Sequence, residues 1–158
     1  MDRVLFRFLV PLLVVLHFLL HLGFGLGPEA PDLMTVALLL AARELTMGWA
    51  GGLGFLLGLL EDALSVLAFG ANTVALTVVG ALGSRTRDLF MGDSRLFVFV
   101  YVGVGKWVRD LVHWLLAGEG IREPFWNALL VKATFSAVYA GLVAVVIFFP
   151  FGRREAQR

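Results

Sequence analysis

Residues 51–62, which read GGLGFLLGLLED, decide the fold of this chain. Glycines recur along this apolar run at spacings typical of closely packed helices, and the run ends in two carboxylates, Glu61 and Asp62. Carboxylates at membrane depth are costly and are therefore usually paired or functional. The fold thus depends on whether the flanking sequence is also typical of a membrane protein.

The composition indicates a membrane protein. The chain has 158 residues, of which 59% are hydrophobic and 16% charged, and its mean hydropathy is +0.89. A soluble domain of this size has too little interior to bury so much apolar surface. The net charge of +1 gives no reason to expect a nucleic-acid partner, and the absence of cysteine excludes disulfides and thiolate metal sites. We therefore predict an all-α, polytopic integral membrane bundle that forms a single transmembrane domain over residues 1–158.

Six apolar segments are expected to span the membrane, because about 20 helical residues cross roughly 30 Å of hydrocarbon. We expect the first segment to be a span and not a cleaved signal peptide, because it is longer than the apolar core of a signal peptide and no Ala-x-Ala-like cleavage site follows it. Asp32 is a candidate N-cap of the second segment. The third and fourth segments are short, so either the fourth continues past Ser84 or the bilayer is thinned there. Alternatively, the two segments form a re-entrant hairpin. The expected segments are 4–26, 32–47, 49–64, 72–83, 96–117 and 124–149.

Basic residues predict the orientation, because cytoplasmic loops are enriched in Lys and Arg. With six spans, one side of the membrane carries Arg3, Arg7, Arg43, Arg85, Arg87, Arg95, Arg153, Arg154 and Arg158. The loops on the other side hold Arg122 together with Glu29, Asp32, Glu119 and Glu123. Both termini are therefore expected to be cytoplasmic, with Glu61 and Asp62 near the outer end of the third span.

A polar stripe in the fifth segment is the main candidate site. It comprises Lys106, Arg109, Asp110 and His113, which follow i, i+3, i+4, i+7 and so share one helix face. Glu61 or Asp62 is the natural counter-ion for Arg109 or Lys106, and we expect Asp62 to pair with Arg109. Lys132 comes at a comparable depth and could join. The cluster is interpreted as a structural salt-bridge network, as an outward polar cavity for a partner segment or an anionic head group, or as a proton relay.

Glycine and histidine spacings add two further hypotheses. Gly48-x-x-x-Gly52 and Gly54-x-x-x-Gly58 favour close helix packing, either inside the bundle or with a partner. His17 and His21, one turn apart, are expected to bond to nearby carbonyls rather than to bind a metal. We expect no metal and no cofactor.

The chain contains no GxxxxGK[ST], HExxH or GxSxG motif, and its loops are too short for a catalytic domain. We therefore predict that it is not an enzyme, with intramembrane chemistry on a lipid kept as a remote alternative.

Several of these residues resemble the MreD family of rod-shape-determining membrane proteins. Pro31-Asp32-Leu33 opens the second span as it does in that family, and residues 54–64 resemble its Gly-Phe-x-x-Gly-Leu-x-x-Asp stretch. Phe69-Gly70-Ala71-Asn72 is similar to its Leu-Gly-x-Asn step, with Phe69 and Glu61 as departures. The stripe around Arg109 has no counterpart that we place in the family pattern. The residues that carry the resemblance are Pro31, Asp32, Gly54, Phe55, Gly58, Asp62, Gly70 and Asn72.

The resemblance implies a non-enzymatic scaffold of the bacterial elongation complex in the inner membrane, needed for cell shape and lateral peptidoglycan synthesis. Its expected partners are a single-span MreC-like protein and membrane lipids, with RodA, a class B penicillin-binding protein and MreB in the wider complex. The family is also similar in fold to the S-components of energy-coupling-factor transporters. A substrate-capture subunit of a vitamin transporter is therefore the alternative function.

Overall fold

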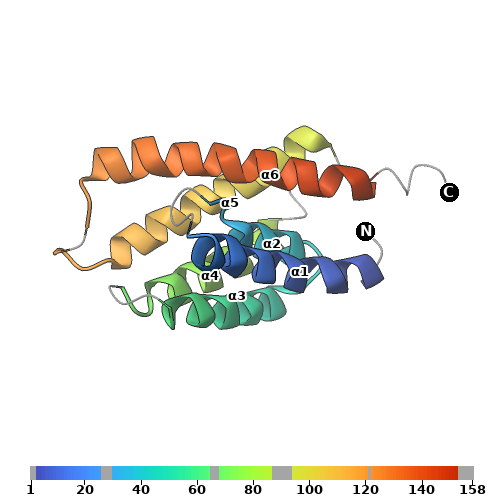
Figure 1. Cartoon of the computed structure of the whole chain (residues 1–158), viewed down its shortest axis with the longest axis horizontal. Helices are drawn as coiled ribbons and strands as arrows, with labels where there is room; N and C mark the ends of the chain where they lie inside the picture. The colour runs from blue at the N-terminus through green and yellow to red at the C-terminus, as the bar shows by residue number, and fades with distance from the viewer. Residues whose placement is uncertain (1–2, 26–29, 65–67, 87–93, 121, 153–158) are drawn as a thin grey trace.

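The computed structural model describes residues 3–25, 30–64, 68–86, 94–120 and 122–152, and every regular element in these ranges is a helix (Figure 1). The all-α prediction is thereby confirmed. Two segments, η1 and η4, are π-helical and continue directly into or from an α-helix. In chain order the elements are α1 (Arg3–Phe18), η1 (Leu19–Gly23), α2 (Leu33–Ala42), α3 (Met47–Asp62), α4 (Ala71–Thr86), α5 (Arg95–Leu116), η4 (Trp126–Ala133) and α6 (Thr134–Gly152).

The second and fourth expected segments differ from the structure in length. The fourth helix continues past Ser84 to Thr86, as one of the two expectations required. The second was predicted to reach about residue 47, which is wrong because α2 already ends at Ala42. The hydroxyl of Ser84 donates a 2.7 Å hydrogen bond to the carbonyl of Leu45, so a contact distant in sequence supports the turn before α3. Arg43 and Glu44 follow directly after α2, so polar residues mark this turn in the sequence.

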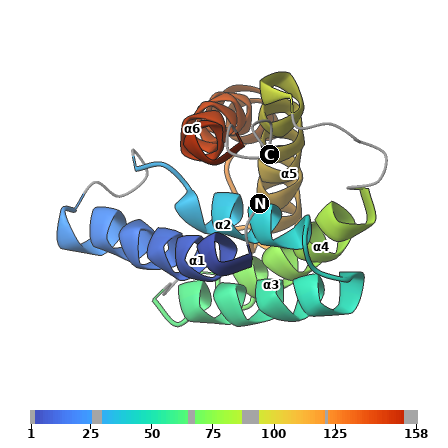
Figure 2. The same ribbon diagram turned by 90° about the vertical axis from the view of Figure 1, so that its right-hand side faces the viewer.

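Successive helices run in alternating directions along the long axis, so α1 begins and α6 ends at the same end of the bundle (Figure 1). An end-on view places α2 in the middle, with α1 and α3 on one side and α5 and α6 on the other (Figure 2). Every other α-helix contacts α2. The helix that was expected to be an ordinary span is therefore the centre of the core.

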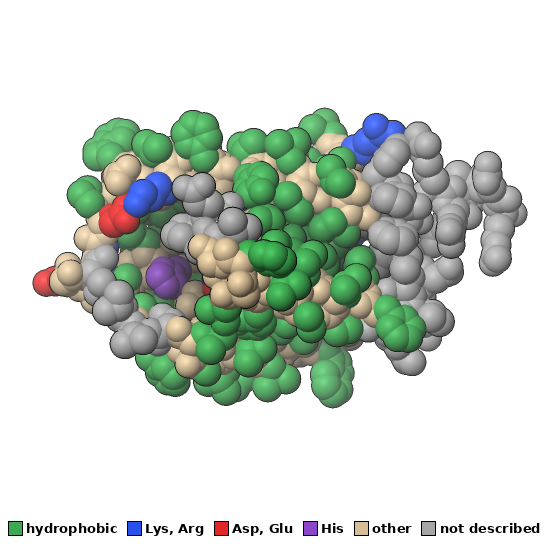
Figure 3. Space-filling model, in the orientation of Figure 1, with side chains coloured by type: hydrophobic (Ala, Val, Ile, Leu, Met, Phe, Trp, Pro, Cys, Tyr) green, Lys and Arg blue, Asp and Glu red, His purple; other side chains and the backbone are tan. Residues whose placement is uncertain are grey.

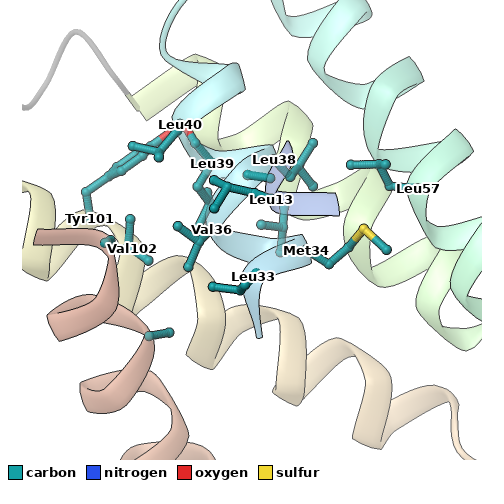
Figure 4. Packing of buried hydrophobic residues seen from close by; sticks show 14 of the residues in the cluster. Leu13, Leu33, Met34, Val36, Leu38, Leu39, Leu40, Leu57, Tyr101 and Val102 are labelled. Atoms are coloured by element: carbon teal, nitrogen blue, oxygen red, sulfur yellow. The ribbon is translucent and has the colours of Figure 1, made fainter. Parts of the chain in front are cut away.

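All ten residues of α2 are buried, which explains why the helix is apolar on every face. Its side chains fill the space between Tyr101 and Val102 of α5 and Leu57 of α3 (Figure 4). Ten helical residues rise only ~15 Å, about half of a hydrocarbon layer. The core is thus built around a short helix enclosed by longer ones.

The glycines divide into an inward and an outward pair. A Cβ added at Gly58 would lie 2.6 Å from the carbonyl oxygen of Asn72, and one at Gly54 would lie 2.7 Å from the carbonyl carbon of Leu76. These two glycines therefore allow α3 and α4 to pack backbone to backbone. Gly48 and Gly52 are exposed, and nothing lies within 4 Å of a Cβ added at either one. The second glycine motif thus packs inside the bundle and the first does not.

Polarity is inverted relative to a soluble protein, with apolar side chains outside and several charges inside (Figure 3). Phe8 of α1 and Phe135 of α6 are 71% and 73% exposed, whereas Arg109 is 8% exposed and Asp62 is fully buried. Among the described residues, one helix, Trp126–Ile147, has the length of 22 residues and the hydropathy needed to cross a membrane. Exposed apolar surface of this extent marks an interaction with lipid or with other proteins.

Candidate functional site

The candidate site is a buried charge network centred on the guanidinium of Arg109. The Nη1 group of Arg109 donates to Oδ2 of Asp32, at the start of α2. Its Nη2 group donates to Oε1 of Glu61 at 2.5 Å, near the end of α3, and to Oδ1 of Asn72 at 3.1 Å, in the first turn of α4. Since Arg109 belongs to α5, one side chain connects four helices. The planar fork of an arginine suits it to several simultaneous acceptors.

Lys106, one turn before Arg109, forms the second cationic centre. Its ammonium group pairs with Asp110 of the same helix and lies 3.6 Å from Oδ2 of Asp32. Asp32 also accepts hydrogen bonds from the backbone NH of Thr35 at 3.0 Å and from its hydroxyl at 2.7 Å. Asp32 is therefore the N-cap of α2, as predicted, and also a shared counter-ion of two buried cations, which was not foreseen.

Asp62 does not pair with Arg109, and that prediction is wrong. Its carboxylate accepts from the backbone NH groups of Gly70 at 2.9 Å, Asn72 at 3.2 Å and Thr73 at 2.9 Å, and from the Thr73 hydroxyl at 2.6 Å. These donors lie at the start of α4, where helical NH groups lack partners within the helix. Gly70 has a φ of +92°, which lets the chain turn into that position. Asp62 is thus a capping group supplied by the neighbouring helix.

Of the remaining residues of the predicted cluster, some belong to the charge network and others lie outside it. Glu61 is the carboxylate of α3 that meets Arg109, so this part of the expectation is confirmed. His113 is half-buried, and its side chain forms no hydrogen bond within the described ranges. Lys132 does not join the network: it is exposed and pairs with Glu123 at 2.6 Å. The network therefore comprises Asp32, Glu61, Asn72, Lys106, Arg109 and Asp110.

The two histidines of the first helix lie at the same end of the bundle. Their rings stack at 4.0 Å, and Nδ1 of His21 lies 2.9 Å from the carbonyl oxygen of His17, the kind of contact that was predicted. His17 is buried, and its Nδ1 lacks a hydrogen-bond partner within the described part of the chain. Glu61 Oε2 and Arg109 Nε are likewise buried and unpartnered there. No group of three or more His, Cys, Asp or Glu residues with metal-site geometry occurs among the described residues.

A cleft of about 970 Å³ adjoins the network between α5 and the η4–α6 segment. Asp110 and His113 line it from α5, and Lys132, Ser136 and Tyr139 line it from the other side. Ser136 and Tyr139 were missed at the sequence level. Their spacing of i+4 and i+7 from Lys132 is the signal that would have placed all three on one face.

The arrangement is suited to holding helices in register. Three carboxylates face two cations in a buried network that touches four helices, so loss of one partner leaves another charge unpaired. Comparisons of the chain with models of protein families, with curated proteins and with solved structures find no match. The resemblance to the MreD family therefore stays a prediction from the sequence motifs.

Proposed function

We propose that this protein is a non-enzymatic, six-helix scaffold of the bacterial inner membrane, related to MreD and acting in cell shape and lateral peptidoglycan synthesis. The observation that carries the membrane part of the proposal is the inverted polarity of the bundle. Arg109 and Lys106 are buried among carboxylates, while large apolar side chains cover α1, α3 and α6. In a membrane that arrangement satisfies the charges and matches the lipid.

The motif residues support the MreD-like part of the proposal, because five of them have a defined packing task. Gly54 and Gly58 allow α3 to approach α4, and Asp62 caps α4. Gly70 forms the turn between them, and Asn72 binds Arg109. A motif in which most members fix helix packing fits a protein that presents a rigid surface to partners.

The proposed partner is a single-span MreC-like protein, through which the bundle would join RodA, a class B penicillin-binding protein and MreB. The test is affinity purification of the tagged full chain from native membranes in mild detergent, followed by mass spectrometry. We expect an MreC-like protein and cell-wall synthases to be recovered. Arg109→Met should lose them because the network is broken, whereas Lys132→Met, which removes an exposed cation, should retain them.

One observation favours a second candidate function, a substrate-capture subunit of an energy-coupling-factor transporter. The cleft beside Asp110 and His113 has a volume at the upper end of the ~300–1,000 Å³ range of small-molecule sites. Recovery of ATPase subunits with a bound vitamin in the same purification would replace the scaffold proposal with this one. Recovery of neither set of partners would contradict both.

A further inference from the structure

Helices α5 and α6 approach closely in one half of the bundle and separate in the other (Figure 1). A Cβ added at Gly141 would lie 2.8 Å from the carbonyl oxygen of Phe99, and one at Gly103 would lie 3.4 Å from that of Ala137. Beyond these contacts the helices diverge, and the π-helical turn η4 forms part of the far wall of the cleft. π-Helical turns occur frequently at functional sites.

The cleft has polar groups that the charge network does not use. The side chains of Ser136, Tyr139 and His113 form no hydrogen bond within the part of the chain that the structure describes. Lys132 pairs with Glu123, but both side chains are largely exposed, at 60% and 46%. Exposed pairs of this kind are weak, so Lys132 is free to exchange its partner for a ligand. Lys132, Ser136 and Tyr139 thus present one ammonium and two hydroxyl groups along a single helix face.

Acidic and basic groups balance in the cleft. Asp110 and Glu123 supply two carboxylates, and Arg122 and Lys132 supply two cations. Arg122 is occupied by the carbonyls of Leu115 and Ala117 and by the ring of Trp114, 4.7 Å away. Asp110 uses Oδ1 for Lys106, which leaves Oδ2 available at the inner end of the cleft. A ligand with one negative and one positive group fits this pattern better than an anion alone.

We propose that the cleft binds the head group of a zwitterionic phospholipid that carries a primary ammonium. The phosphate lies against Lys132, Ser136 and Tyr139, and the ammonium lies against Asp110. Leu129 and Phe135, which also line the cleft, contact the acyl chains. The inference rests on the membrane insertion in the proposed function but not on any protein partner, so loss of MreC-like recovery would leave it standing.

The test uses the full chain in nanodiscs with equal amounts of phosphatidylethanolamine, phosphatidylcholine and phosphatidylglycerol. After mild extraction, the lipid retained on the protein is quantified by native mass spectrometry. We expect phosphatidylethanolamine to be retained about tenfold over the other two, because both its ammonium and its phosphate find partners. The variant Ser136→Ala/Tyr139→Phe should lose most of this preference. Asp110→Asn should lose the discrimination against phosphatidylcholine, whose quaternary ammonium has no NH to donate.

The matched control is Ser84→Ala/Tyr101→Phe, which removes one serine and one tyrosine hydroxyl outside the cleft. These hydroxyls donate to the carbonyls of Leu45 and Leu39. This control should keep the lipid preference. Equal retention of the three lipids, a preference for phosphatidylglycerol, or an equal loss in the control would overturn the proposal. Competition by soluble phosphoethanolamine at the same affinity as the lipid would overturn the lipid assignment and make the ligand a free metabolite.

Discussion

At the scale of single residues, Arg109 holds the buried charge network together. It contacts Asp32 and Glu61 from two other helices, and the contact with Glu61 is 2.5 Å. Removing one partner of a buried pair typically lowers stability by about 3–5 kcal/mol, because the remaining charge is buried without compensation. Lys106 still neutralises part of Asp32 at 3.6 Å, so Glu61 is the group most exposed to this penalty.

We therefore expect Arg109→Met to lower the free energy of unfolding by about 3 kcal/mol in detergent denaturation. Lys132→Met is the control, because it removes a cation from an exposed pair and should change stability by less than about 1 kcal/mol. The double variant Glu61→Gln/Arg109→Met should recover part of the loss, since the unpaired carboxylate is then gone. Equal effects of the two Met substitutions would show that burial of the network does not matter.

Asp62 has a different task, and a charge swap reveals it. Its four hydrogen bonds to residues 70–73 come from backbone NH groups and one hydroxyl, not from a cation. Asp62→Ala should lower the free energy of unfolding by about 2 kcal/mol, the upper range for loss of a helix cap. The swap Asp62→Arg/Arg109→Asp should give no rescue over either single variant in the same assay. Partial rescue would mean that the two side chains pair after all.

The difference between Glu61 and Asp62 shows what the sequence contains and what it lacks. Gly54, Gly58 and Asp62 are spaced by four, so they lie on one face of α3, and the glycine face is the one that packs on α4. That spacing places Asp62 on the face that contacts α4, so Glu61 is the carboxylate that can pair with Arg109. The role of Asp32, 77 residues from Arg109, follows no spacing rule, because it depends on where α2 lies within the bundle.

At the scale of helices, the glycines of α3 that pack against α4 should tolerate substitution less well than the glycines that do not. Gly58→Val places a branched side chain where even a Cβ would lie 2.7 Å from the Thr73 nitrogen. The helices must separate, and overpacking of this kind costs typically about 1–3 kcal/mol. Gly52→Val is the matched control, because nothing lies within 4 Å of the added Cβ. We expect a clear fall in thermal stability for the first variant and little change for the second.

A comparison of helix ends shows where tertiary contacts override local sequence. The bounds of α5 lie within a residue of those expected from hydropathy, because both ends coincide with polar turns. The end of α2 was misplaced although Arg43, Glu44 and Thr46 make the turn at 43–46 polar, and Ser84 of α4 stabilises that turn by donating to Leu45. The π-helical character of η1 and η4 has no sequence signal that we recognise. Helix existence was predictable here, and polar residues marked the ends of both α2 and α5.

At the scale of the whole molecule, membrane insertion predicts that some side chains exposed in the isolated chain do not react with a water-soluble reagent. The chain has no cysteine, so a single introduced thiol is a unique reporter. Glu44→Cys and Glu119→Cys place it at exposed positions at opposite ends of the bundle, and Leu142→Cys places it on α6, where the native side chain is 54% exposed. Basic residues are cytoplasmic by preference, and Arg43 and Arg95 lie at the end that includes Glu44.

In spheroplasts treated with a membrane-impermeant maleimide, we expect rapid labelling of Glu119→Cys and labelling of Glu44→Cys only after lysis. Leu142→Cys should react poorly in both conditions, because hydrocarbon would cover a side chain that is open in the isolated chain. Rapid labelling of Leu142→Cys would contradict insertion of α6, and labelling of both ends from outside would contradict the three spans expected between residues 44 and 119. These labelling outcomes also bear on the stability of the buried Arg109 network. If lipid does not cover the apolar exterior, water reaches the exposed leucine and phenylalanine side chains, and only the helix-packed core remains to offset the cost of the buried cations.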